Sequence, residues 1–592
     1  MSSLNLFFVL FLFTFSFSFF NVKCTFLNLS PYNYPKRQGN LKDARYQVAL
    51  LGTNDLNGYL FPEYYTNPLT GKKYTGRGLK NLWGYISNIR RGWGSRLVWL
   101  DAGNQFEGTL ESKVSFGESM NNFFNFAGLN GANIGKNDWN YGEDFLKNYI
   151  KRNNFPVTLT NVYDNNLESN IFLPNQFNIT VLSAGKIKIG IIGISSFINE
   201  YDQKLNNLEF KQYADAIIPA AASLRNVYGV NIVVLLSDPS MKCQEYPADN
   251  EELKLNIMSN SNNICQYEGE LFNLLSLLPE KTVDVVISTS GESDSLNHHF
   301  FNGIPIISAN KNGKNFNVIY LSFDKNTLEY IPSQTIIEGP IPVCHKVFAN
   351  TKNCEELTSI EEANKAGELQ NFLFHGRPLD FDPRIDTLFF PYIGMTAKYE
   401  SEILTKLSET LKMEPSKETV LGNLISDYLI NATEADIAIV DPAIAKGEWL
   451  VGNLNISNVL KMFPETKTFI VTFEMKGHEI KRMIKELTLH KGNIYPTSGL
   501  IQYIKSGKVK DVKLNDESEI NDDQVYVIAS TDNSVPKFEN GFSEINQWYQ
   551  PRNLHYIENF VFGIIDYLKS FGEDGFDKSE FYDTKLLRVR EA

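Results

Sequence analysis

Polar residues follow three short apolar runs of the sequence at the point where each run ends. The runs "VALLGTNDLNG", "RLVWLDAGNQ" and "VNIVVLLSDPS" lead into Asp55, Asn104 and Asp238. Carboxylate and amide oxygens can hold divalent cations, and two such cations about 3.5–4 Å apart can activate a water for hydrolysis. The types of these residues therefore point first to metal-dependent chemistry.

Imidazole ligands are scarce in the same region. Between residues 43 and 335 the sequence has only His298 and His299. Adjacent side chains on a strand or helix point apart, so we expect a loop pair and not two ligands of one metal. Asp238 and Glu292 leave open a weak Ca²⁺ or Mg²⁺ site made of oxygen ligands, although too few anionic groups remain to balance two dications.

The elements that must position these residues are strands buried on both faces. From Tyr46 to about Asp324, runs of Val, Ile and Leu alternate with longer mixed segments, which predicts a layered α/β domain. Loops at the strand ends would carry the chemistry. We expect a signal segment over 1–24, a first domain over 43–335, a linker with a connecting helix over 336–413, and a second α/β domain over 414–592.

Composition and charge argue against some classes of partner and indicate where the protein is located. The chain has 592 residues and a formal net charge of −13, which argues against a nucleic-acid partner. The apolar run "LFFVLFLFTFSFSFF" reads as a secretory signal, with a membrane anchor as the alternative. No second apolar span and no apolar C-terminal tail follow, so we expect a secreted protein without a membrane or glycolipid anchor.

Cysteines and glycosylation triplets fit an oxidising compartment. Cleavage after Cys24 would leave four cysteines, for which we favour the pairs Cys243–Cys265 and Cys344–Cys354, although the other two connectivities stay open. Acceptor triplets, which also arise by chance, occur at four asparagines: Asn28, Asn178, Asn431 and Asn455.

Several motifs in order resemble those of the secreted 5′-nucleotidase and apyrase family. "TNDLNG", "DAGNQFEGT", "FPVTLTNV" and "PIISANKNGKNFNVIYLSFD" resemble family segments of the first domain, and "ETVLGNLISD", "YPTSGL" and "IIDYLKS" those of the second. The resemblance implies an α/β fold of two domains, a calcineurin-like metallophosphoesterase and a nucleotide-gripping C-terminal domain, joined by a helical linker. It also implies a zinc-type pair of divalent metals.

The sequence departs from the family at most of the implied site positions. Asp55 is the one metal ligand kept intact. The other metal positions carry different residues, namely Asn57, Asn104, Lys136, Asp238, Ser290 and Glu292, and the catalytic His and Asp are replaced by Asn137 and Asn140. We therefore expect no metal cofactor and no hydrolysis. Lys136 either replaces the lost cations as a partner of Asp55 and Asp238 or is a solvated loop lysine.

The implied nucleotide-binding positions are altered too. Asp441 and Lys446 replace an asparagine and a phosphate-binding arginine, and arginine and lysine differ at bidentate sites. Ile494 and Ser534 align with the two phenylalanines that sandwich the base, and Asn540 with the aspartate of a Gly-Gly-Asp-Gly turn. Each lost stack removes roughly 1–3 kcal/mol per base.

Three functions follow from these patterns. The first is a secreted inactive homologue that binds an unknown extracellular protein or receptor. Non-hydrolytic salivary relatives in blood-feeding arthropods suggest inhibition of platelet aggregation. The second is an active nucleotidase or apyrase with divergent ligands, and the third is a nucleotide scavenger without hydrolysis.

Overall fold

The structure, a computed structural model, describes most of the chain after residue 44. It covers residues 45–591 except 107, 142, 170–174, 197–207, 242–253, 257–268, 292–296, 380–381, 464–467, 492, 535–551, 573–574, 577–578, 580 and 583–586. The predicted signal segment lies outside the described residues.

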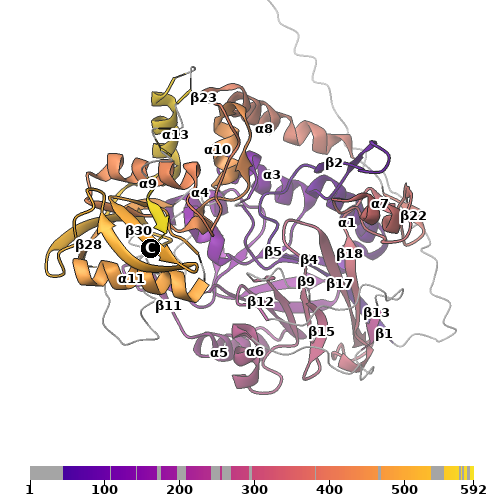
Figure 1. Cartoon of the computed structure of the whole chain (residues 1–592). Helices are drawn as coiled ribbons and strands as arrows, with labels where there is room; N and C mark the ends of the chain where they lie inside the picture. Colours follow the sequence, from indigo (N-terminus) through magenta and orange to yellow (C-terminus); the bar gives the residue numbers. More distant parts are fainter. Residues whose placement is uncertain are drawn as a thin grey trace, which may run out of the picture. The chain divides into compact units, whose positions relative to one another are not determined.

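Eight strands form one mixed sheet, in the order β13 (Lys254–Asn256), β18 (Ile336–Pro342), β17 (Asn315–Asp324), β1 (Arg45–Thr53), β4 (Leu97–Asp101), β5 (Gly131–Ala132), β6 (Val157–Thr158) and β8 (Gln176–Phe177) (Figure 1). β1 pairs antiparallel with β17 and parallel with β4. β18 continues this sheet beyond residue 335, where the first domain was expected to end.

Six strands form a second sheet, in the order β15 (Asn297–Phe301), β16 (Ile304–Ser308), β14 (Val285–Ser288), β12 (Ile232–Ser237), β10 (Ile187–Ile194) and β9 (Thr180–Ala184). The four inner strands are parallel, and the two edge strands run antiparallel to them. Every residue of β12 and β14 is buried, as the continuous Val, Ile and Leu runs predict for strands covered on both faces.

The two sheets pack against each other between outer helices. One core contains Leu50 and Leu100 from the first sheet and Ile189 and Val234 from the second. Three helices share the other core of the first sheet: α1 (Leu79–Trp93), α3 (Glu118–Ala127) and α4 (Glu143–Lys151). The outer face of the second sheet is covered by α5 (Tyr213–Asn226) and α6 (Glu270–Leu277) (Figure 1). The result is a layered α/β arrangement that leaves polar loops at the strand ends.

The C-terminal part contains two smaller sheets. Five strands run in the order β29 (Thr497–Ser498), β25 (Ile437–Ile439), β32 (Val525–Thr531), β28 (Phe469–Lys476) and β33 (Arg552–Asn559), and three in the order β31 (Lys508–Leu514), β30 (Leu500–Lys505) and β34 (Val589–Glu591). One core joins α9 (Val420–Thr433), α10 (Ile456–Met462) and α13 (Phe560–Ser570). A second core contains α11 (Gly477–Lys491) and residues from both sheets.

The connecting helix predicted within "DPRIDTLFFPYIGMTAKYESEILTKLSETL" is α8 (Pro383–Ser401). The Asp382 side chain caps its first turn by accepting a hydrogen bond from the Arg384 N–H at 3.0 Å, and Pro383 supplies a first-turn proline. The following residues form β23 (Ile403–Leu407) and not the further helix turns that their apolar spacing suggested.

Shorter elements complete the described chain: α2 (Leu110–Val114), α7 (Ile360–Ala366), β2 (Tyr64–Thr66), β3 (Lys73–Thr75), β7 (Val162–Asp164), β11 (Leu208–Phe210), β19 (Lys346–Phe348), β20 (Leu369–Asn371), β21 (Leu373–Phe374), β22 (Arg377–Pro378), β24 (Leu411–Lys412), β26 (Glu448–Trp449) and β27 (Gly452–Asn455). Within the described part of the chain, no helix combines the length and apolarity needed to cross a bilayer.

Candidate functional site

Four of the residues predicted from the motifs meet at the carboxyl ends of strands from both sheets. Asp55 follows β1 and Asn104 follows β4, while Asp238 follows β12 and Ser290 follows β14. All four are buried. Parallel strands bring their carboxyl ends to one edge of a sheet, which explains how residues so far apart in sequence come together.

The Asn104 amide lies between the two carboxylates of this cluster. Its Nδ2 donates to Asp55 Oδ1 at 2.8 Å and to Asp238 Oδ1 at 3.3 Å. Its Oδ1 accepts from the main-chain N–H of Asn137 at 2.9 Å. The opposite amide orientation would place an oxygen against two carboxylates and an NH₂ against an N–H, so the partners determine which way the amide points.

Further donors occupy the remaining carboxylate oxygens. Asp55 Oδ2 accepts from Asn54 Nδ2 at 2.7 Å and from the Ser290 N–H and hydroxyl at 2.7 and 2.9 Å. Asp238 Oδ2 accepts from the N–H groups of Lys136 and Ser196, each at 2.9 Å. Every oxygen of the two carboxylates therefore has at least one donor from the protein.

The position of Lys136 differs from the predicted replacement for a cation. The contact with Asp238 comes from its main-chain N–H, and its side chain is exposed, as in the alternative of a solvated lysine. A neutral amide and N–H groups thus meet the buried carboxylates where an ammonium was considered. The reason is local, because Lys136 begins the short 3₁₀ helix η2 (Lys136–Tyr141), whose first N–H groups point at the cluster.

Two further buried carboxylates were missed at the sequence level. Asp138 accepts from the N–H groups of Asn104 at 2.8 Å, Gly135 at 2.9 Å and Gln105 at 2.7 Å. Asp101 accepts from the Thr53 hydroxyl at 2.6 Å and from Gln105 Nε2 at 3.0 Å. Asp101 lies in the motif "DAGN" and Asp138 in "GKND", so the motifs themselves could have pointed to both residues. Their hydrogen bonds fix the loop that carries Asn104.

Burial dominates the electrostatics of these four aspartates. Desolvation raises the pKa of Asp238 to about 6, of Asp101 to about 7 and of Asp138 to about 8, against the hydrogen bonds that favour the ionised forms. It also raises the pKa of Asp55 above its usual range. The cluster therefore carries less negative charge near neutral pH than four exposed aspartates would.

A pair of divalent cations does not fit this arrangement. Cation ligands must offer lone pairs, but the side of Asn104 that faces Asp55 and Asp238 is an NH₂ group, which has none to offer. The carboxylate oxygens are already engaged by N–H and O–H donors. Binding a cation there would require these hydrogen bonds to break and the amide to turn.

The other predicted positions of this site border the cluster through main-chain groups or are only partly described; the Asn57 N–H, for example, donates to the Asn104 carbonyl at 3.1 Å. Asn57 Nδ2 donates to Asn312 Oδ1 at 2.9 Å. Asn137 contributes its main-chain N–H, while its side chain is exposed. Asn140 lies in η2, its side chain not described, and Glu292 lies outside the described residues, so the weak oxygen-ligand site with Asp238 stays a prediction.

Three of the predicted nucleotide-binding positions line one small cavity in the C-terminal part. Asp441, Lys446 and Ser534 surround a space of about 40 Å³, together with Phe463 and Phe560. The Asp441 side chain accepts from the Ala443 N–H at 2.8 Å, at the start of η5 (Pro442–Ile444). Ile494 is buried and is not one of the lining residues, and Asn540 lies outside the described residues.

Comparison with known proteins relates the chain to 5′-nucleotidases. Residues 395–544 match the family model of the 5′-nucleotidase C-terminal domain. The chain is 22% identical to Protein UshA of Escherichia coli over 498 residues, which cover 80% of this chain and 83% of that protein. It is 27% identical to the 5′-nucleotidase of Mus musculus over 199 residues, 32% of this chain and 33% of that one. The chain is a 5′-nucleotidase family homologue.

Solved structures give the same fold for this 5′-nucleotidase homologue. A Staphylococcus aureus structure described as a 5′-nucleotidase in complex with α-ketoglutarate matches with a TM-score of 0.61 and 14% identity, over 92% of this chain and 100% of that one. The 5′-nucleotidase precursor of Thermus thermophilus matches with a TM-score of 0.56 and 18% identity, over 92% and 99%. The predicted two-domain α/β 5′-nucleotidase fold is confirmed.

The two histidines of the homologue's first domain lie on an edge strand, not in the predicted loop. His298 and His299 are consecutive residues of β15, which pairs antiparallel with β16. His298 is buried, and burial lowers the pKa of both imidazoles to about 4. The apolar residues of "HHFF" and the adjacent strand explain why this segment extends the sheet.

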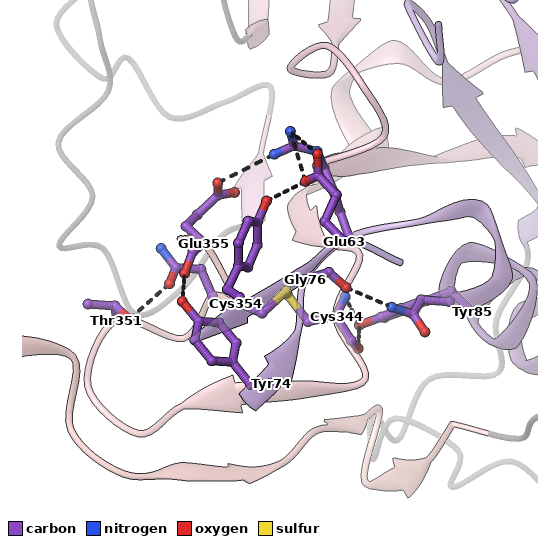
Figure 2. The surroundings of a disulfide bond; sticks show 12 residues. Glu63, Tyr74, Gly76, Tyr85, Cys344, Thr351, Cys354 and Glu355 are labelled. Atoms are coloured by element: carbon purple, nitrogen blue, oxygen red, sulfur yellow. Dashed lines mark hydrogen bonds and ion pairs between the residues drawn. A yellow bond between two sulfur atoms is a disulfide. The ribbon is translucent and has the colours of Figure 1, made fainter. Parts of the chain in front are cut away.

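The homologue contains a disulfide between Cys344 and Cys354, one of the two pairs predicted from the sequence. Figure 2 shows it beside Tyr74 and Tyr85, whose hydroxyls donate to the carbonyls of Glu355 and Cys344, each at 2.8 Å. The bond thus closes a loop that is also held by two tyrosines of the first domain. Cys243 and Cys265 lie outside the described residues.

The predicted glycosylation positions have different surroundings. Asn431 is exposed near the end of α9. Asn455 caps α10: its Oδ1 accepts from the Asn458 N–H at 2.9 Å, and its Nδ2 donates to the Glu400 carbonyl at 2.8 Å. Asn178 is half-buried, and Asn28 lies outside the described residues.

Proposed function

We propose that this 5′-nucleotidase homologue is a secreted, catalytically inactive protein that acts by binding an extracellular partner. The observation that carries the proposal is the Asn104 NH₂ group, which donates to both Asp55 and Asp238. A shared anionic ligand between two cations is the central requirement of two-metal hydrolysis. The NH₂ group of Asn104 at the position of this shared ligand supports the loss of the two cations.

Loss of the cations would remove the means of activating water. Zinc lowers the pKa of a bound water from 15.7 to about 7, and no described side chain of the cluster offers a comparable effect. The buried aspartates are engaged by N–H and O–H donors, which opposes their use as bases. Phosphate-ester hydrolysis should therefore be lost.

The nucleotide positions support weak or absent nucleotide binding. The exposed Lys446 lines the cavity with Asp441 and Ser534, whereas Ile494 is buried and is not one of the lining residues. Ile494 and Ser534 offer no aromatic ring to a base, and each missing stack would cost roughly 1–3 kcal/mol. We therefore favour a macromolecular partner over a nucleotide, and the nucleotide scavenger becomes an outcome of the test.

Secretion is part of the proposal. The apolar N-terminal run, the Cys344–Cys354 disulfide and the four acceptor triplets support an oxidising compartment. The platelet-directed salivary role that the family resemblance implies is one form of this proposal.

The test is hydrolysis together with metal content. The protein is secreted from a eukaryotic host and incubated with ATP, ADP and AMP in Zn²⁺, Ca²⁺ or Mg²⁺, with Escherichia coli UshA assayed in parallel. We expect phosphate release at the level of buffer and less than one metal ion per chain. Turnover above buffer that disappears with chelator would overturn the proposal. Calorimetry with the same nucleotides tests the scavenger: tight binding without turnover would establish it.

A further inference from the structure

We propose that the Asn104 side chain has taken over the mechanical role of the cations and holds the two sheets together as a neutral cross-link. The wild-type fold would then need no divalent cation at this position. This inference extends the proposed loss of catalysis to what the former site now does, and it is tested by a separate measurement.

The connections made by Asn104 span both sheets. Its NH₂ joins the loop after β1, through Asp55, to the loop after β12, through Asp238. Its oxygen joins the same point to η2 through the Asn137 N–H. Ser290 adds the loop after β14 indirectly, through two hydrogen bonds to Asp55, so the ends of β1, β4, β12 and β14 are linked in one network around the amide.

The chemistry of an amide suits this position better than that of a carboxylate. An amide provides two N–H donors for two carboxylate acceptors and one oxygen for an N–H donor, and all are used. A carboxylate at residue 104 would present an oxygen, and no donor, to the buried carboxylates of both Asp55 and Asp238. Without a cation, such an arrangement is strongly unfavourable in a buried site.

The main chain around residue 104 favours asparagine or aspartate over other residues with a Cβ. Asn104 has a φ of +59°, in the left-handed region that asparagine and aspartate tolerate better than other residues with a Cβ. The approach to Gly135 is so close that a Cβ built on that glycine would overlap Asn104 Oδ1. Asn104→Asp therefore changes the charge and donor pattern while keeping the shape and the main-chain preference.

A matched control comes from the same loop system. Asn57 also has a positive φ, +47°, and its N–H donates to the Asn104 carbonyl, but its Nδ2 donates to the Asn312 amide oxygen and, among the described residues, to no carboxylate. Asn57→Asp makes the same chemical change, and the Asn312 amide can turn to donate to the new carboxylate. The comparison of the two variants isolates the contact with Asp55 and Asp238.

The experiment is hydrogen exchange followed by mass spectrometry on the full chain in chelator. For Asn104→Asp we expect peptides at the ends of β1, β4 and β12 to exchange at least 100-fold faster than in the wild type, about 2.8 kcal/mol of local opening. Asn57→Asp should stay within threefold of the wild type. Equal protection in the two variants would overturn the proposal, as would a wild type that gains 10-fold or more protection from Ca²⁺, Mn²⁺ or Zn²⁺.

A second variant covers the case in which Asn104→Asp fails to fold. In Asn104→Asp/Asp238→Asn, the new amide can accept from the Lys136 and Ser196 N–H groups and donate to residue 104, which restores one donor–acceptor contact. We expect the double variant to be secreted and at least 10-fold better protected than the single one. A double variant no better than the single one would argue against the cross-link. Hydrolysis by the wild type would overturn the proposed function but leave this comparison intact.

Discussion

Ser290 donates twice to one buried oxygen of Asp55, from its N–H at 2.7 Å and from its hydroxyl at 2.9 Å. The two residues are 235 positions apart, one at the end of β1 and the other after β14. Ser290 is fully buried, so no solvent can replace a lost donor at this point. The contact ties the first sheet to the second at the candidate site.

Ser290→Ala tests the weight of that hydroxyl. We expect the free energy of unfolding to fall by about 1–3 kcal/mol, because a hydrogen bond to a buried carboxylate is lost while its acceptor stays in place. Chemical denaturation followed by tryptophan fluorescence measures it. Ser276→Ala is the control, since Ser276 lies on α6 and its exposed hydroxyl donates to the main-chain carbonyl of Phe272 at 2.9 Å. Equal effects of both changes would contradict the assigned role.

The disulfide predicts a second effect on stability. Cys344 and Cys354 are 10 residues apart, and loop-closure entropy for such a loop corresponds to about 3 kcal/mol. The double change Cys344→Ser/Cys354→Ser should therefore lower the unfolding free energy by about that amount without altering the candidate site. The unfolding free energy of the wild type treated with reductant should approach that of the variant. A variant as stable as the wild type in both conditions would show that the neighbouring hydrogen bonds of Tyr74 and Tyr85 suffice.

The strands of the first domain were largely predictable, because their signal is local. Runs such as "NIVVLLS" and "VDVVIS" are apolar on both faces, and they form β12 and β14. The segment "HHFF" was predicted as a loop and not as a strand. Its pairing with β16 is a tertiary contact, and the sequence pattern of the segment does not predict it. The end of α8 at Ser401 was missed for the same reason: the following apolar residues pair with β27.

At the candidate site, the sequence identified the positions but not their contacts. The motifs brought Asp55, Asn104 and Asp238 into consideration, and these three residues do meet. The sequence does not say which group faces a carboxylate, so the Lys136 ammonium was considered where the N–H and the Asn104 amide act. Donor direction depends on main-chain geometry, here on η2 and on the positive φ of Asn104, and neither is visible in residue types alone.

Occupancy of the glycosylation triplets should follow their surroundings. We expect peptide mapping of the secreted protein to show a glycan on Asn431, which is exposed on α9. Asn455 should be largely unmodified, because both ends of its side chain are engaged at the start of α10 and at the Glu400 carbonyl. Asn431→Gln should remove the mass of one glycan, and Asn455→Gln should leave the glycan mass unchanged. A glycan found on Asn455 alone would contradict this assignment.

The histidine pair on β15 predicts how stability changes with pH. Burial lowers the pKa of His298 and His299 to about 4, whereas an imidazole in the unfolded chain has a pKa of about 6.5. Since the folded pKa is the lower one, the unfolded state binds more protons between these values. The contribution is therefore fully present above pH 6.5 and is lost as pH falls toward 4.

The double change His298→Phe/His299→Phe measures this contribution, because it removes both titrating groups from a strand that already contains Phe300 and Phe301. Between pH 7.5 and 5.0 the wild type should lose about 2 kcal/mol more unfolding free energy per histidine than the variant, from 1.5 pH units at 1.36 kcal/mol each. Denaturation curves at both pH values give the difference. Parallel pH profiles for the two proteins would mean that the imidazoles are not held neutral by the fold, and a steeper loss in the variant would reverse the sign of the argument.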